Sequence, residues 1–189
     1  MTEGHIVDLL TDTLVVYLED KLKFGIPESD ESRSALIRGG RLQEDPTRLE
    51  AINYVLIQEG DPEHEGWIHQ GNSIVDNPTI DTGFTFEMGG GSLFWRRMSI
   101  EVGGYYIIPK YDRNQARDHF HRFIGRTAYY TQHSIIDRTS QVLGLKDEFG
   151  EEIIGLYVVK ERYNESGGPP KSFIWRGRIN FDVLTHRSW

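Results

Sequence analysis

Two alternating stretches decide the fold: Ser92-Leu93-Phe94-Trp95-Arg96-Arg97-Met98-Ser99-Ile100-Glu101-Val102 and Phe173-Ile174-Trp175-Arg176-Gly177-Arg178-Ile179-Asn180-Phe181-Asp182-Val183-Leu184-Thr185. Successive side chains of a strand point to opposite faces of the sheet. Each stretch therefore has one mostly apolar face, while the other face carries most of its charged residues. We predict two half-buried strands whose apolar faces cover one side of a sheet.

Further strands are predicted around these two. Gly103-Gly104 permits either a tight hairpin or a bulge that carries the strand onward to Ile108. A third strand is predicted over residues 153–163, before a loop at 164–171. The short β-branched run at 52–57 favours a strand, although Thr47 and Glu50 just before it have the spacing of a helix capping box.

Two helices are predicted, one on each side of the first strand stretch. From Ile6 to Phe24 the apolar residues recur at steps of three and four, as on an amphipathic helix, and Gly25 ends the run. Asp112 and Gln115 have capping-box spacing, and a second apolar stripe follows them to about Arg138.

The elements together predict the α+β class: an antiparallel sheet with helices packed on one face and long loop insertions. The loops are expected over residues 26–50 and 67–91, which are rich in polar residues, glycine and proline. A chain of 189 residues with no repeat is expected to form a single domain, residues 1–189.

Composition limits the classes of partner. The chain has 21 Lys and Arg against 29 Asp and Glu, a formal net charge of −8, so nonspecific binding to DNA or to an anionic membrane is disfavoured. It has no cysteine, which excludes disulfides and thiolate metal sites. No apolar run is long enough to span a bilayer, and we expect a soluble, unprocessed chain.

The residues that could carry catalysis are interpreted as solvent-exposed. His119 and His121 lie two apart on the predicted helix and so point in nearly opposite directions, which argues against a shared metal ion. The acidic pairs 147–148 and 151–152 lie in turn-like polar stretches and are interpreted as solvated charge. We expect no metal, no cofactor and no enzymatic activity.

Arginines beside tryptophans are the most suggestive pattern for binding. A guanidinium group can pair with a carboxylate of a neighbouring chain or stack on a ring, and Trp and Arg are enriched at interfaces. An exposed sheet face with ordinary charges would give the same pattern. The candidate subunit-interface residues are Trp95, Arg97, Trp175 and Arg176. The candidate partner-binding loop contains Trp67, Ile68, Phe84 and Phe86.

The order of these elements resembles the tail terminator and related neck proteins of tailed bacteriophages. The likeness is carried by the N-terminal helix, the glycine-flanked strand at 90–102, the central helix and the closing strand at 173–185. It implies a structural virion protein of the tail or neck, assembled in the host cytoplasm. Copies would form a hexameric ring at the head-proximal end of the tail tube, in contact with the tail tube protein and a head completion protein.

An acidic ring suits a channel through which DNA passes without specific binding, because acidic side chains facing the lumen repel phosphates. Two alternatives stay open. One is another head–tail adaptor, tail-completion or baseplate component, which follows the same ring logic. The other is a small-ligand-binding or enzymatic α+β domain, with a pocket lined by Trp95, Tyr105 and Tyr106.

Overall fold

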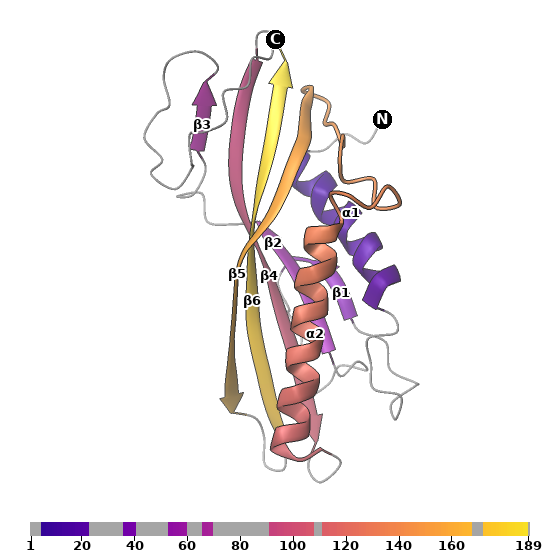
Figure 1. The fold of residues 1–189 in the computed structure, drawn as a ribbon, viewed down its shortest axis with the longest axis vertical. Coiled ribbons are helices and arrows are strands. Elements are labelled where there is room, and N and C mark those ends of the chain that lie inside the picture. Colours follow the sequence, from indigo (N-terminus) through magenta and orange to yellow (C-terminus); the bar gives the residue numbers. More distant parts are fainter. Residues whose placement is uncertain are drawn as a thin grey trace.

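The structure is a computed structural model that describes residues 5–22, 36–40, 53–59, 66–69, 91–107, 111–167 and 172–188. This part of the chain contains two helices and a six-stranded sheet (Figure 1). In chain order the elements are α1 (Ile6–Leu22), β1 (Leu36–Gly39), β2 (Asn53–Glu59), β3 (Gly66–His69), β4 (Gly91–Ile107), α2 (Arg113–His133), β5 (Glu151–Gly167) and β6 (Ser172–Ser188).

The sheet confirms the α+β prediction. Its strand order is β1-β2-β4-β6-β5, with β3 added to β4 beside β2. Every pairing is antiparallel except that of β1 with β2. Both helices lie on the same side of the long twisted ribbon formed by β4, β6 and β5 (Figure 1). Strands β5 and β6 follow one another in the chain and pair along their lengths, as is usual for consecutive antiparallel strands.

Strand β4 passes straight through Gly103-Gly104, so the predicted turn or bulge is wrong, although the continuation of the strand is confirmed. Gly103 lies opposite Arg176 and Gly104 opposite Trp175, with no shift of register. Each glycine instead leaves room for a tyrosine ring that packs against the strand. A Cβ atom on Gly103 would collide with the ring of Tyr54, which crosses the strand at that point.

The two predicted loops each contain a short strand that sequence reasoning missed. Residues 36–39 form β1, parallel to β2, and residues 66–69 form β3, antiparallel to the start of β4. Four residues are too few to show a clear alternation of apolar and polar side chains, and Gly39 and Gly66 suggested turns. The other residues of both predicted loops, except Gly40 and Gly91, and the capping-box pair Thr47 and Glu50, lie outside the described residues.

Helix α2 begins with the predicted capping box. The Gln115 N–H donates to Asp112 Oδ1 at 2.8 Å, and the Asp112 N–H donates to Gln115 Oε1 at 3.2 Å. The helix ends at His133, earlier than the predicted Arg138. A serine hydroxyl helps to end the helix there: Ser134 Oγ donates to the carbonyl of Thr131 at 2.7 Å. Such local bonds from serine to the backbone compete with continuation of a helix.

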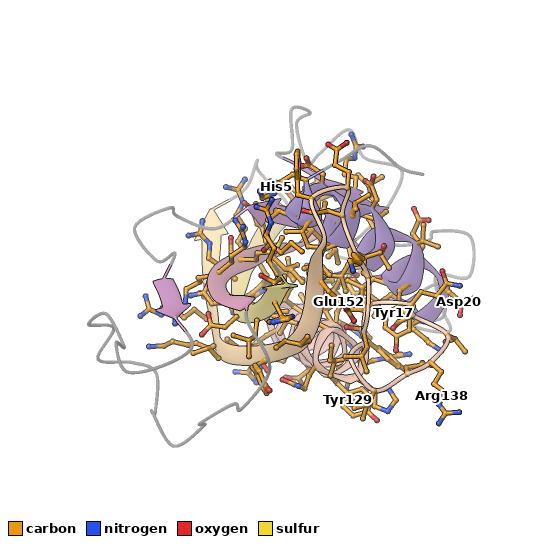
Figure 2. All side chains as sticks on the ribbon, turned by 90° about the horizontal axis from the view of Figure 1, so that it is seen from above. His5, Tyr17, Asp20, Tyr129, Arg138 and Glu152 are labelled. Atoms are coloured by element: carbon orange, nitrogen blue, oxygen red, sulfur yellow. The ribbon has the colours of Figure 1, made fainter. Side chains whose placement is uncertain are left out.

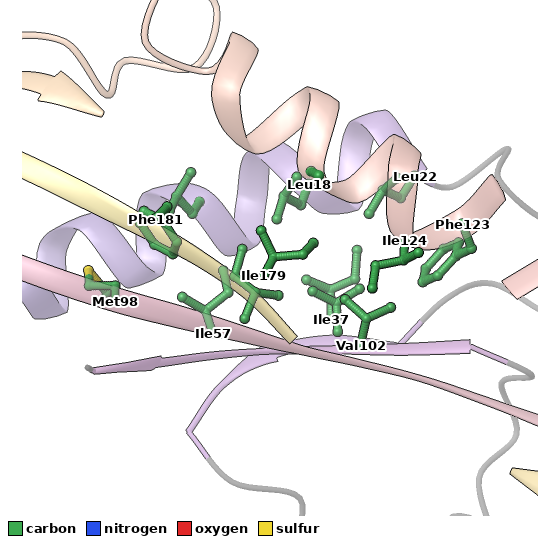
Figure 3. Packing of buried hydrophobic residues seen from close by; sticks show 14 of the residues in the cluster. Leu18, Leu22, Ile37, Ile57, Met98, Val102, Phe123, Ile124, Ile179 and Phe181 are labelled. Carbon is green, nitrogen blue, oxygen red and sulfur yellow. The ribbon is translucent and has the colours of Figure 1, made fainter. Parts of the chain in front are cut away.

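The core lies between the two helices and the sheet. The predicted inward-facing residues are buried: Met98, Ile100 and Val102 from β4, and Trp175, Ile179, Phe181 and Val183 from β6. Figure 3 shows residues of this cluster facing apolar side chains of both helices, among them Leu18, Leu22 and Ile124. One expectation fails: Ile174, placed on the charged outer face by the alternation, is also buried.

Helix α2 also supports the edge strand β5, whose register shifts between Val158 and Lys160. The Gln132 side chain takes the place of a neighbouring strand at this bulge. Its Nε2 donates to the Leu156 carbonyl at 3.0 Å, and its Oε1 accepts from the Val158 N–H at 2.7 Å. These two hydrogen bonds fix the position of α2 relative to the edge of β5.

Candidate interaction surfaces

The sheet face turned away from the helices carries a row of charged side chains. Arg97 on β4 lies opposite Asp182 on β6, with Nε 2.8 Å from Oδ1 and Nη2 3.2 Å from Oδ2. Further along, Glu101 lies opposite Arg178. These cross-strand positions place opposite charges side by side, which stabilises an antiparallel sheet.

Cations outnumber anions on this outer face, in contrast to the acidic chain as a whole. Lys160 and Arg162 on β5 lie opposite Asn180 and Arg178 on β6. Both are exposed, as are Arg176 and Arg178. The face therefore offers a basic surface to any acidic partner.

Toward β2 the ring of Tyr54 packs over Gly103 on this outer face. Tyr54 is buried, and its hydroxyl donates to Glu101 Oε1 at 3.1 Å. Burial and the neighbouring Glu101 carboxylate raise the pKa of Tyr54 to about 12, while Arg176 lowers it by a smaller amount. Both burial and a nearby negative charge disfavour the ionised phenol. Tyr54 thus stays neutral and acts as a packed hydrogen-bond donor.

The four predicted interface residues do not share one exposed surface. Trp175 is only 8% exposed, because α2 covers it within its own chain. Its ring lies 6.0 Å from that of Phe120 in a stacked arrangement. This corrects the assignment of Trp175 to an exposed interface. Arg97 is half-buried and ion-paired, where full exposure was expected, whereas Arg176 is exposed.

The other predicted surface residues lie on β3 and β4 or outside the described residues. The backbone of Trp95 lies opposite Leu184 on β6. Trp67 and Ile68 of the predicted partner-binding loop belong to β3, where they lie opposite Phe94 and Leu93 of β4. Phe84 and Phe86 lie outside the described residues.

The acid pair at 151–152 contains a buried carboxylate, which corrects its interpretation as solvated charge. Glu151 is 5% exposed, and Arg96 Nη2 lies 3.1 Å from its Oε1 and 3.2 Å from its Oε2. The Thr185 hydroxyl also donates to Oε1. The signal was present in the sequence, because the alternation of β4 places Arg96 on the core-facing side, where a cation requires a partner.

Asp147 is buried as well, again in contrast to the prediction, while Glu148 is exposed as predicted. Oδ1 of Asp147 accepts the N–H groups of Phe149 at 2.9 Å and Glu151 at 2.8 Å. The carboxylate closes the turn that leads into β5. Both buried acids therefore fix the position of the segment between α2 and β5.

A third carboxylate, Asp137, joins this segment to α1. Its Oδ2 accepts the Tyr17 hydroxyl at 3.0 Å and lies 3.2 Å from Lys21 Nζ. Its Oδ1 accepts the hydroxyl and the N–H of Thr139, at 2.7 and 2.9 Å. The Thr139 hydrogen bonds, with smaller contributions from Tyr17 and Lys21, lower the pKa of Asp137 below its usual range. Each of these groups favours the ionised carboxylate.

His119 and His121 lie on α2 and contact different aromatic rings. His119 packs edge-on against Tyr111, and His121 packs edge-on against Trp175, with ring centroids 6.0 Å apart in the second pair. Within the described segments, no group of three or more histidine, aspartate or glutamate residues is placed to hold a metal ion. Neither described helix is long and apolar enough to cross a membrane.

Comparison with known proteins gives no match, either to a protein-family model or to a curated protein. The surfaces are therefore interpreted from their own geometry. Three features define them: the basic outer sheet face, the outer edge of β5, and the outward sides of the two helices.

Proposed function

We propose that this chain is a structural subunit that assembles with copies of itself into a ring, as a tail terminator of a tailed phage does. The observation that carries the proposal is the basic outer face of the β4–β6–β5 ribbon. Neither helix covers this face, and exposed Arg176 and Arg178 project from it. A folded sheet with one charged, uncovered face is suited to contact with another protein.

Charge gives the assembly a physical basis. The chain as a whole has a net charge of −8 while this face is basic, so different parts of two copies attract one another. Contacts between different surfaces of identical subunits are heterologous, and they close into a ring when the rotation allows it. In the proposed neck, the ring joins the tail tube protein to a head completion protein and leaves an open path for DNA.

The internal ion pairs support a structural rather than a catalytic role. General acid or base chemistry requires a carboxylate that can reach a substrate. Glu151, one of the two buried acids among the described residues, is instead held by Arg96 and Thr185. Asp147 is held by backbone N–H groups.

Native mass spectrometry over a concentration series, with electron microscopy of any oligomer, tests the proposal. We expect a hexamer with a central hole. Arg162→Glu should weaken the assembly, because it reverses a charge on the exposed face, while circular dichroism shows a folded chain. Arg117→Glu, the same change on an exposed helical residue, is the matched control. A strict monomer at every concentration would contradict the proposal.

Arg162 is a better test position than Arg97 or Arg176, because it lies opposite another cation, Arg178, whereas Arg176 interacts with the buried Tyr54 beside Glu101. Arg97→Glu would place two carboxylates side by side within one chain, because Arg97 pairs with Asp182, and so would perturb folding as well as assembly. A thermal-shift assay against a panel of metabolites separates the proposed ring subunit from the alternative of a small-ligand-binding domain. A ligand binder gains stability from its ligand, whereas a ring subunit gains stability from its own concentration.

A further inference from the structure

Helix α1 presents an acidic stripe to solvent. Asp8, Asp12, Val16 and Glu19 recur at steps of four, four and three, which places them on one side of a helix. All four are exposed, Val16 at 68%. None of the three acids in the stripe forms an ion pair with a described residue. The acidic stripe therefore combines unneutralised negative charge with an exposed apolar centre.

Helix α2 presents a basic stripe of the same length. Arg122, Arg126, Tyr129 and His133 recur at steps of four, three and four. Tyr129 is 60% exposed and stacks on His133, with centroids 5.4 Å apart. Neither arginine forms an ion pair with a described residue. This basic stripe stands out in a chain whose net charge is −8.

The two stripes match in length. From its first residue to its last, each stripe advances eleven positions along its helix. At the rise of an α-helix, this corresponds to a length of about 17 Å. The two helices lie side by side on the same face of the sheet (Figure 1), and in the view from above the labelled Tyr17 of α1 and Tyr129 of α2 lie toward the same side of the molecule (Figure 2). Within the described chain no ion pair joins the acidic stripe to the basic stripe, so both stripes are available to a second copy.

We propose that the acidic stripe of α1 docks against the basic stripe of α2 in a neighbouring copy. With the two helices antiparallel, Glu19 would lie between Arg122 and Arg126 and Asp12 beside His133, while the apolar centres at Val16 and Tyr129 come into contact. The stripes therefore supply opposite charges and a matched apolar contact to a second copy of this chain.

The proposal rests on the proposed ring and adds a contact between helices to the contact made by the basic outer sheet face. Acidic and basic stripes are different surfaces, so the contact is heterologous, and each copy uses one stripe toward each neighbour. Because the charged residues lie at the surface, the attraction is screened by salt, and the assembly should weaken as the ionic strength rises.

Charge reversal tests the contact. The acid-reversed variant carries Asp12→Arg and Glu19→Arg, and the base-reversed variant carries Arg122→Glu and Arg126→Glu. Each alone sets like charges against each other at every contact. We expect each to self-associate about tenfold more weakly than the unmodified chain, or worse, in analytical ultracentrifugation.

Mixing the two variants is the decisive experiment. In an equimolar mixture, the reversed stripe of each variant meets an oppositely charged stripe on the other, so assembly should return with the two variants alternating. Native mass spectrometry distinguishes the alternating oligomer by mass. Assembly in the mixture would exclude misfolding as the cause of the loss, because a misfolded chain is not rescued by a partner. A mixture that stays unassembled, although circular dichroism shows both variants folded, would overturn the proposal.

Matched controls place the same charge changes elsewhere on the surface. Glu148→Arg with Glu161→Arg mirrors the acid reversal, and Arg113→Glu with Arg117→Glu mirrors the base reversal on the same helix; all four residues are exposed. Both controls should assemble normally. Assembly by either reversed variant at the level of the unmodified chain would overturn the helix contact but leave the ring intact. A monomeric unmodified chain would overturn both.

Discussion

Replacing Glu151 by glutamine keeps the shape of a buried side chain while it removes the charge that Arg96 faces. Only 12% of the Arg96 side chain and 7% of the Glu151 side chain are exposed, so water cannot solvate the remaining cation well. Removing one partner of a buried ion pair typically costs about 3–5 kcal/mol. The glutamine oxygen can still accept from Arg96 and Thr185, so we expect a loss of about 3 kcal/mol in the free energy of unfolding.

A double-mutant cycle with Arg96→Met separates the pair from its surroundings. Each single change leaves a buried charged group without its oppositely charged partner, whereas the double variant leaves no unpaired charge. The double variant should therefore lose about 2 kcal/mol less than the sum of the two single losses. Urea unfolding followed by circular dichroism gives the three values.

A comparison with a pair nearer to solvent checks the reasoning. The side chains of the Arg97–Asp182 ion pair are 23% and 13% exposed. Asp182→Asn disrupts this pair and should cost about 1 kcal/mol. Strictly additive losses in the Arg96–Glu151 cycle, or an equal cost at Asp182 and Glu151, would refute the view that burial makes the inner pair important.

Two further predictions concern local packing and acid stability. The Tyr54 ring must move to admit a side chain at Gly103. Gly103→Ala should therefore lower the free energy of unfolding by about 2 kcal/mol. Gly125 on α2 has open space around it. Gly125→Ala should raise the free energy of unfolding by about 0.5–1 kcal/mol, and urea midpoints that shift in the same direction for both variants would contradict this. Because the folded pKa of Asp137 lies below its unfolded value, its stabilisation is complete above about pH 4 and disappears as pH falls through the folded pKa. Thr139→Val should raise that pKa in an NMR titration while Thr139→Ser leaves it low, and equal values in the two variants would contradict the role of the hydroxyl.

The sequence predicted the main elements because each carries a strong local signal. Helix α1 follows a regular apolar stripe, and α2 begins at the expected pair of Asp112 and Gln115. The long strands β4 and β6 follow from strict alternation. These signals depend only on neighbours in the chain, so no knowledge of the tertiary contacts was needed.

The errors arose where distant residues decide the local structure. Gly103 looked like a turn because the sequence does not show that the Tyr54 ring crosses the strand there. Glu151 looked solvated because its neighbours in the chain are polar, while Arg96, 55 residues away, pairs with it in the interior. Alternation predicted Trp175 on the core face, whereas its arginine neighbour suggested an exposed interface. In the structure α2 covers the Trp175 ring, so the residue belongs to the core.

The sequence by itself determined the helices, the long strands and the side of the sheet that is apolar, since periodicity is a property of consecutive residues. Only the tertiary structure decided which charges are neutralised inside the chain and which remain on its surface. Arg96 and Arg97 are adjacent in sequence, yet they pair with Glu151 and Asp182 on opposite faces of the sheet. The strand register and the packing of the segment before β5 bring those partners within reach, and both depend on residues far apart in the chain.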